Sequence, residues 1–219
     1  MRLKELLKSK IFRTDQVIRY SGLRTREPET LSHHIIEVQL LSLKMYYELL
    51  ELGYNELELG QLLYKGLLHD MDEVITGDFP RPIKYYNKEI RDSIEFVADK
   101  SVQWLSYNEF GSMEPYEVWS TSKLGHAGLV IKVSDLAVVA KKAAEEVLIF
   151  GNNEYLKVLD EVKGYMRETK SVLLSMNNDK LVEYLIDFIN LLISDLNEIS
   201  IDQSLLEIVS YKDYIKQGE

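Results

Sequence analysis

The sequence predicts an all-α protein. Apolar residues recur at helical spacing along nearly the whole chain. Only 4 prolines and 11 glycines interrupt the 219 residues, and a hydrophobic content of 46% is enough for a sizeable core. The length fits one domain with an appendage. We therefore expect a main helical domain at residues 1–176 and a C-terminal helical extension packed on it at residues 177–219.

The charge balance limits the class of partner. There are 26 basic and 36 acidic residues, so the net charge is -10, which argues against a nucleic-acid polymer as ligand. A small phosphorylated molecule needs only a few local cations. There is no cysteine, so a metal would have to bind nitrogen and oxygen ligands. With no apolar run that reads as a membrane span, and a charged, amphipathic start, we expect a cytoplasmic protein that binds no membrane.

The first elements bring two histidines to a helix start. A helix is expected from Leu3 to about Tyr20, followed by a polar loop at residues 23–30. The next helix is expected from Ser32, a favourable N-cap, to Gly53. His33 and His34 then lie in its first turn, where the helix dipole favours the neutral imidazole that binds metal.

The stretch from Leu67 to Pro80 concentrates ionisable side chains. It belongs to the end of a helix that Asn55 and Glu58 would open as a capping pair. His69 and Glu73 are four residues apart and would share a helix face. The four carboxylates of the stretch are Asp70, Asp72, Glu73 and Asp78. The pattern suits a metal site, and it equally suits a solvated acidic face with one satisfied histidine.

The second half of the chain is also helical by spacing. The expected helices are Asn87–Tyr107, Ser122–Phe150, Glu154–Met176, Asp179–Asn197 and a short one ending near Tyr214, with a turn at residues 108–115. Asp135 is the only acid between Ser122 and Lys142. An acid in so apolar a run is costly unless it is exposed, bound to a metal or paired with a lysine or arginine.

These residues can be combined into a metal site. His69, Asp70 and Asp135, with either His33 or His34, come from three predicted helices. Two imidazoles and two carboxylates suit a divalent transition metal such as Mn, Co, Ni, Fe or Zn. Such an ion lowers the pKa of a bound water and polarises a phosphoryl oxygen. Glu73 would be placed to transfer the proton.

A distant histidine, an adjacent His-Asp pair and a later aspartate resemble the signature of the HD-domain metal-dependent phosphohydrolases. Within that group the chain is similar to the 5′-deoxynucleotidases and to the phage-type deoxynucleoside triphosphohydrolases. The similarity is carried by Arg19-Tyr20, Ser32-His33-His34, HDMDEVITGDFPRPIKYYN at residues 69–87, Ser134-Asp135 and residues 151–154. The resemblance implies a single HD-domain helical bundle at residues 1–176, with additional C-terminal helices.

The resemblance also implies roles for individual residues. His34, His69, Asp70 and Asp135 would hold the metal, with His34 preferred because the family has a small residue, any residue, then histidine. Glu73 and Asp78 would be catalytic, and Asp78 would meet the sugar 3′-hydroxyl. The expected substrate-binding residues are Arg19, Tyr20, Asp78, Pro80 and Lys84. The family usually has tryptophan where this chain has Tyr20, and Arg19 and Lys84 are equally interpretable as ordinary solvated cations.

Three functions follow from these expectations. The first is hydrolysis of deoxynucleoside 5′-monophosphates to deoxynucleoside and phosphate by a metal-activated water, in a homodimer. The second is a triphosphohydrolase that releases triphosphate, with additional Mg²⁺ on Glu73 and Asp78. The cation Arg81 near the expected phosphates, with Arg24 and Arg26, favours this option slightly. The third is a non-catalytic nucleotide-binding module. HD enzymes with two tightly held metals need more histidines, and the remaining His126 reads as a surface residue.

Overall fold

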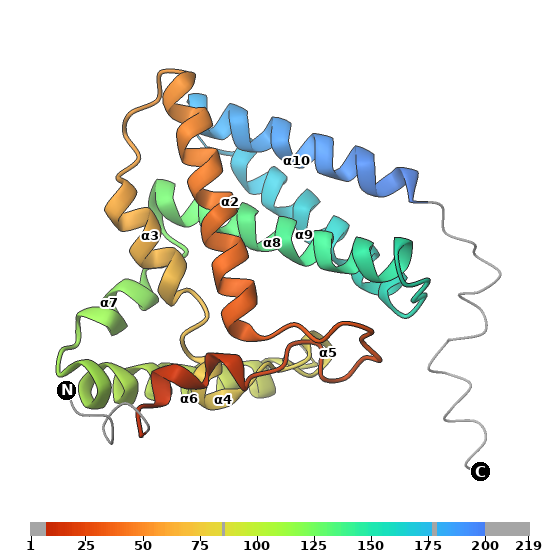
Figure 1. The fold of residues 1–219 in the computed structure, drawn as a ribbon. Helices are drawn as coiled ribbons and strands as arrows, with labels where there is room; N and C mark the ends of the chain where they lie inside the picture. The colour runs from red at the N-terminus through yellow and green to blue at the C-terminus, as the bar shows by residue number, and fades with distance from the viewer. Residues whose placement is uncertain (1–7, 85, 177–178, 200–219) are drawn as a thin grey trace, which may run out of the picture. The chain divides into compact units, whose positions relative to one another are not determined.

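The computed structural model describes residues 8–84, 86–176 and 179–199 (Figure 1). Helices dominate these residues, and the only extended pairing among them is one isolated β-bridge, which confirms the all-α prediction. In chain order the elements are η1 (Lys10–Asp15), α2 (Leu31–Glu51), α3 (Leu59–Leu68), α4 (Glu73–Thr76), α5 (Arg81–Lys84), α6 (Lys88–Leu105), η2 (Ser106–Phe110), α7 (Glu114–Ser120), α8 (Gly125–Leu148), α9 (Tyr155–Leu174) and α10 (Lys180–Glu198). No helix of the described part combines the length and apolar character that a bilayer crossing requires.

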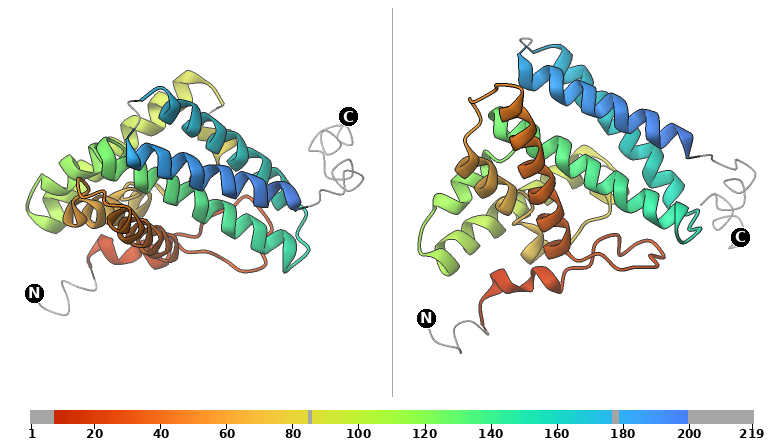
Figure 2. Two further views of the ribbon diagram at one scale, coloured as in Figure 1. Left: turned by 90° about the horizontal axis from the view of Figure 1, so that it is seen from above. Right: turned by 45° about the horizontal axis from the view of Figure 1, so that its top comes forward.

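The chain forms two compact units. The first comprises residues 1–23 and 28–135, and the second comprises residues 24–27 and 136–219. In the first unit α2 and α3 lie side by side, and in the second α9 packs along α10 (Figures 1 and 2). The expected boundary between residues 176 and 177 stays a prediction, because residues 177–178 lie outside the described part. The short helix predicted near Tyr214 lies outside it as well.

The helix predicted up to Tyr20 is wrong beyond Asp15. The 3₁₀-helix η1 ends there, and Ile18 then pairs in antiparallel fashion with Thr30. The backbone N–H of Arg19 donates to the carbonyl of Glu29 at 2.9 Å. These extended residues find their backbone partners across the loop instead of within a helix, which is why the helical spacing upstream does not continue. Residues 3–7 of the predicted helix lie outside the described part.

Three predicted helix starts and one predicted turn also need correction. α2 begins one residue earlier than expected, because the Thr30 side chain, not Ser32, accepts the capping bond from the N–H of His33 at 3.2 Å. α3 begins at Leu59, and Glu58 precedes it without a side-chain cap bond, so the predicted capping pair with Asn55 does not form. α7 begins inside the stretch predicted as a turn, and α8 begins at Gly125 instead of Ser122.

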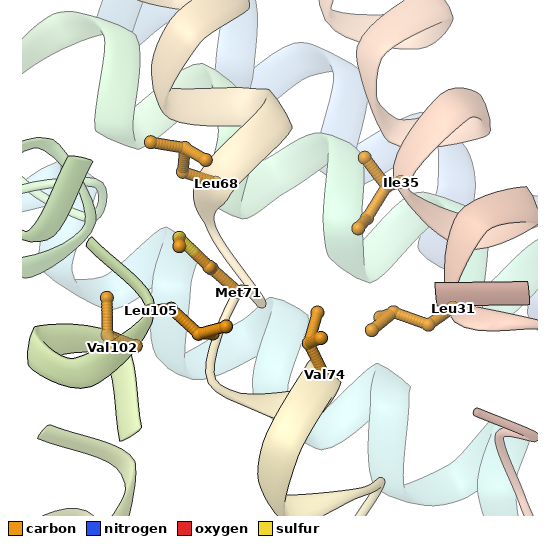
Figure 3. Close-up of a cluster of buried hydrophobic side chains, with 7 residues drawn as sticks. All are labelled: Leu31, Ile35, Leu68, Met71, Val74, Val102 and Leu105. Atoms are coloured by element: carbon orange, nitrogen blue, oxygen red, sulfur yellow. The ribbon is translucent and has the colours of Figure 1, made fainter. Parts of the chain in front are cut away.

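The stretch from Leu67 to Pro80 is not one helix. α3 ends at Leu68 and α4 begins at Glu73, with tight turns between them in which the N–H of Met71 donates to the carbonyl of Leu68. Residues three apart line up in such turns. Leu68, Met71 and Val74 therefore reach one hydrophobic cluster, which Figure 3 shows. Its other members are Leu31, Ile35, Val102 and Leu105. The helix-face argument for His69 and Glu73 is thus wrong, and the hydrophobic cluster positions this segment instead.

Gly128 in α8 allows a close backbone approach, which gives a stability prediction. A Cβ at this position would lie 2.4 Å from the carbonyl carbon of Lys123 and 2.9 Å from the carbonyl oxygen of Ser122. We expect Gly128→Ala to lower the free energy of unfolding by about 2 to 3 kcal/mol, because backbone atoms must shift. Urea unfolding measures this. The control Gly60→Ala meets nothing within 4 Å, so its stability should be unchanged or higher by up to about 1 kcal/mol. Equal losses in both variants would contradict the packing argument.

The second unit contains a buried carboxylate with many donors. The Glu146 side chain accepts bonds from the backbone N–H groups of Arg26 and Glu27 at 3.1 and 3.2 Å, from Asn152 Nδ2 at 2.8 Å and from Lys142 Nζ at 3.1 Å. Burial opposes the charge, but these bonds outweigh it and lower the pKa of Glu146 to about 2. The charged carboxylate thereby holds the loop at residues 24–27 on the end of α8.

A pH dependence of stability follows from Glu146. The pKa of Glu146 is lower in the folded protein than its ordinary value of 4.5. The contribution of the ionised Glu146 carboxylate to the free energy of unfolding is therefore fully present above pH 4.5 and is lost as the pH falls towards about 2. This contribution amounts to about 3 kcal/mol. We expect Glu146→Gln to reduce the free energy of unfolding at pH 7, and the gap from the wild type to narrow between pH 5 and pH 3. Urea titrations at each pH test this, and a pH-independent gap would contradict it.

Candidate active site

All ten residues predicted for the site lie in the first unit, and the structure brings six of them together. Contacts shorter than 4 Å join Arg19, His34, His69, Asp70, Glu73 and Asp135, which we call the central cluster. The members come from the segment after η1, the first turn of α2, the turn after α3, the start of α4 and the middle of α8. The loop and helix ends of unit one thus converge on a single point.

Two imidazoles face one carboxylate oxygen. His34 Nε2 lies 3.5 Å and His69 Nε2 lies 3.2 Å from Asp70 Oδ2. The ring centroids of the two histidines are 5.6 Å apart. One ligand atom from each of His34, His69 and Asp70 lies within 4.8 Å of the others, and Asp135 Oδ1 is 3.3 Å from His34 Nε2. His34, His69 and Asp70 therefore form a compact group of possible ligands, and Asp135 adjoins it through His34.

The two histidines are buried, and their Nε2 atoms lack hydrogen-bond partners in the described part of the chain. The Nδ1 atom of His69 is 2.7 Å from the carbonyl of Gly66 and donates to it. The Nε2 lone pair of His69 is therefore directed away from that bond. Buried polar nitrogens beside two acids are costly without a cation, so these residues fit a divalent metal. His33 is excluded from the cluster, because its side chain is 60% exposed and pairs with Glu37.

The charges in the cluster depend on one another. Burial raises the pKa of Asp70, but the charges of His69, Arg19 and His34 outweigh it and hold that pKa well below its usual range. Burial alone would lower the pKa of His69, but the charge of Asp70 outweighs this effect, and the net result is a pKa raised to about 9. Asp135 has a lowered pKa despite its burial, because of its close contact with His34 and the charge of Lys132, whose Nζ is 3.8 Å away. Asp70 and Asp135 therefore stay ionised.

Arg19 and Glu73 form the other side of the cluster. Arg19 Nη1 lies 3.2 Å from Asp70 Oδ2 and 3.2 Å from Glu73 Oε2. Arg19 is buried, so it is not an ordinary solvated cation. Burial and the negative charge of Asp70 raise the pKa of Glu73 well above its usual value, and Arg19 only partly offsets them. A carboxyl group with a raised pKa can hold and deliver a proton.

The remaining predicted residues lie beside the cluster. Asp78 Oδ2 accepts the backbone N–H of Tyr20 at 2.8 Å. Among the described residues, Tyr20 alone adopts a positive φ without being glycine, at 57°, so Asp78 stabilises an unfavourable backbone conformation. Pro80, just before α5, and Lys84, at the end of α5, are both half-buried. No ion pair or side-chain hydrogen bond in the described part links either of them to the central cluster.

Two residues that the sequence did not indicate, Trp119 and Glu29, contact the site or the turn that carries Asp70. Trp119 Nε1 donates to Asp72 Oδ1 at 3.2 Å and joins α7 to the turn beside Asp70. Glu29, just before α2, has its Oε1 atom 3.4 Å from Arg19 Nε and 3.4 Å from His34 Nδ1. No spacing rule could find Glu29, because only a single β-bridge brings it to Arg19.

Comparison with known proteins finds one family of relatives. A model of the family described as 5′-deoxynucleotidase YfbR-like matches residues 8–185. A curated 5′-deoxynucleotidase of Vibrio atlanticus is 27% identical over 157 residues, which cover 70% of this chain and 80% of the relative. 5′-Deoxynucleotidase YfbR of Salmonella newport is 26% identical over 144 residues, covering 63% and 70%.

Two solved structures share the fold. An HD-domain phosphohydrolase from Listeria innocua has a TM-score of 0.67 and 19% identity, covering 91% of this chain and all of its own. The cyanophage S-2L HD phosphohydrolase, bound to dA and one catalytic Zn²⁺ ion, has a TM-score of 0.60 and 18% identity, covering 87% and 96%. At these identities the likeness concerns the fold, which is that of the HD-domain phosphohydrolases.

Proposed function

Because this chain belongs to the YfbR-like 5′-deoxynucleotidase family, we propose that it hydrolyses deoxynucleoside 5′-monophosphates to deoxynucleoside and orthophosphate. The observation that carries this proposal is the meeting of two buried imidazole nitrogens and two carboxylates beside the Arg19–Glu73 pair. The curated relatives are named for the same reaction, and one structural neighbour is bound to dA and one catalytic Zn²⁺ ion.

One divalent metal is part of the proposal. His34, His69, Asp70 and Asp135 would hold it, and it would be one of Mn, Co, Ni, Fe or Zn. When bound, the metal would polarise a phosphoryl oxygen and lower the pKa of a water molecule. The support for this assignment is that the two Nε2 atoms are buried, have no hydrogen-bond partners among the described residues and face the ionised carboxylates of Asp70 and Asp135.

The chain's own residues supply binding and proton transfer. Arg19 would bind the phosphate oxygens, since its guanidinium is the cation that lies within the cluster. Glu73, whose pKa is raised by burial and by Asp70, would carry the proton that the 5′-oxygen of the leaving deoxynucleoside requires. The 3.2 Å contact between Arg19 and Glu73 keeps the acid beside the phosphate site.

The sugar and base would meet the residues beside the cluster. Asp78 would accept the 3′-hydroxyl and help to select deoxyribose, and its bond to the Tyr20 backbone fixes the two residues relative to each other. The ring of Tyr20 takes the place of the family's usual tryptophan. Pro80 and Lys84 would complete the substrate site from the segment that follows.

Product analysis by chromatography tests the reaction. The metal-loaded protein is incubated with deoxy- and ribonucleotides at each phosphorylation level, with Mn²⁺ or Co²⁺ present and Asp70→Ala as control. We expect orthophosphate from deoxynucleoside monophosphates, with the triphosphates left intact. Tripolyphosphate from a deoxynucleoside triphosphate, with monophosphates intact, would favour the alternative that uses additional Mg²⁺. If no nucleotide is hydrolysed, the result would favour the third function, a non-catalytic nucleotide-binding module.

A homodimer and a cytoplasmic location remain predictions. The exposed side chains Ile36, Leu40 and Tyr47 follow one side of α2 at spacings of four and seven residues, so they form an apolar stripe. A stripe of this kind is typical of helix packing between subunits. Light scattering of the protein as it elutes from a size-exclusion column should give twice the chain mass of 25.5 kDa. A mass equal to one chain would contradict the dimer.

A further inference from the structure

We propose that Glu29 is a positioning residue that holds the metal ligand His34 and the phosphate-binding residue Arg19 with one carboxylate oxygen. The inference rests on the proposed function and extends it to a residue outside the metal and substrate set. Glu29 Oε1 lies 3.4 Å from His34 Nδ1 and 3.4 Å from Arg19 Nε. Only 2% of Glu29 is exposed, so the carboxylate is committed to these buried neighbours.

The backbone around Glu29 fixes its place. The Ile18–Thr30 bridge and the bond from the Arg19 N–H to the Glu29 carbonyl, at 2.9 Å, align the two segments. Thr30 then caps α2, and the N–H of His34 donates to the Thr30 carbonyl at 3.1 Å. Glu29 is therefore tied to Arg19 on one side and to the first turn of α2 on the other. Its side chain has little freedom to leave the cluster.

The chemistry of the imidazole explains what Glu29 does for His34. A carboxylate accepts hydrogen bonds, so it favours the tautomer of His34 with its proton on Nδ1. The Nε2 lone pair then faces Asp70 and Asp135, at 3.5 and 3.3 Å. Metal-binding histidines commonly donate their other ring N–H to a carboxylate or a carbonyl, which fixes the ring and strengthens the ligand. His69 makes such a hydrogen bond to the carbonyl of Gly66. The 3.4 Å contact between Glu29 Oε1 and His34 Nδ1 lies within ion-pair distance but lacks hydrogen-bond geometry, and Glu29 is the carboxylate placed to accept the Nδ1 proton of His34.

Glu29 acts on Arg19 from the opposite side to the reaction centre. It faces the Nε atom, whereas the Nη1 atom of the same guanidinium faces Asp70 and Glu73. The planar, rigid guanidinium is thereby oriented by acids at two of its nitrogens. The negative charge of Glu29 also offsets the cost of burying the arginine. Loss of that charge should therefore affect both metal affinity and phosphate binding.

The test compares Glu29→Gln with the wild type in two measurements. Mn²⁺ binding to the metal-free protein is followed by the electron paramagnetic resonance signal of the free ion, and kcat and KM are measured for orthophosphate release at saturating Mn²⁺. We expect the Kd for Mn²⁺ to rise by about 10- to 100-fold, the range typical of lost outer-shell partners. KM should also rise, because Arg19 loses an anchor, and inorganic phosphate should inhibit the variant more weakly.

Glu146→Gln provides the matched control, because it also removes a buried carboxylate but lies in the second unit, which holds none of the ten candidate residues. It should lower stability and leave the Mn²⁺ affinity unchanged. Unchanged Mn²⁺ affinity and KM in folded Glu29→Gln would overturn the inference. If that variant does not fold, Glu29→Asp replaces it. Its shorter side chain keeps the charge but withdraws from His34, so an unchanged Kd would again overturn the inference.

The same data separate the inference from the proposed function. A wild-type protein that binds Mn²⁺ and releases orthophosphate, together with an unaffected Glu29→Gln variant, removes only the role of Glu29. A wild-type protein that binds none of Mn²⁺, Co²⁺, Ni²⁺, Fe²⁺ and Zn²⁺ removes the proposed function, and the inference with it.

Discussion

Asp70→Asn is expected to lower kcat/KM for deoxynucleoside monophosphates by more than about 100-fold, beyond the cost of losing an outer-shell partner. The Oδ2 atom of Asp70 is the point that Arg19, His34 and His69 share, at 3.2, 3.5 and 3.2 Å. Asparagine keeps the shape but removes the charge that attracts a cation and the histidine nitrogens. The value of kcat/KM, measured by steady-state kinetics, and the metal content of the purified variant should both fall.

The neighbouring Asp72→Asn is the matched control for this prediction. Asp72 lies two residues further along the same turn, and its Oδ1 atom accepts the indole N–H of Trp119. We expect its kcat/KM to stay within about tenfold of the wild type, since surrounding contacts of this kind cost less than the ligands. If both variants lose activity equally while their metal content is unchanged, Asp70 is not a ligand.

Glu73→Gln is expected to lower kcat by about 10²- to 10⁴-fold, the range for loss of a general acid or base. Its pKa is raised by burial and by the Asp70 charge, which suits a proton donor, and glutamine cannot supply that proton. KM and metal content should change little, because Arg19 keeps its contact with Asp70. Stopped-time orthophosphate assays and metal analysis measure these quantities.

The contrast between the two variants identifies the role of each residue. Asp70→Asn should lose metal and activity together, whereas Glu73→Gln should keep the metal and lose only the rate. A Glu73→Gln variant that retains wild-type kcat would exclude Glu73 as the proton donor. A variant that loses its metal would instead place Glu73 among the ligands, as the triphosphohydrolase alternative requires.

The sequence predicted the helical class because the apolar spacing is long and regular from residue 31 onwards. It could not predict the break between Leu68 and Glu73, since apolar residues three apart fit tight turns as well as an α-helix. The choice of Thr30 over Ser32 as the cap of α2 depends on the loop that precedes it. That loop is held by pairing between residues 17–19 and 29–31, which has no local signal.

The site shows the same limit. The adjacent His69-Asp70 pair was visible in the sequence, and the structure brings it to Arg19, His34, Glu73 and Asp135, whose roles stay proposals. Spacing alone left His33 and His34 equal, and the family resemblance favoured His34. The structure agrees, since His34 is buried and His33 is exposed. Trp119 could not be found from spacing, because its partner Asp72 is 47 residues away in the chain. Glu29 could not be found either, because it lies in the extended segment before α2, where no helical spacing relates it to His34.

The central claim is that His34, His69, Asp70 and Asp135 hold one divalent cation. Anomalous diffraction from crystals of the Zn²⁺-loaded, active protein tests it most directly. The account predicts one strong peak at roughly 2.0 to 2.2 Å from both Nε2 atoms and from oxygens of the two aspartates. A zinc peak bound elsewhere in active crystals, with these four side chains pointing away from it, would contradict the account.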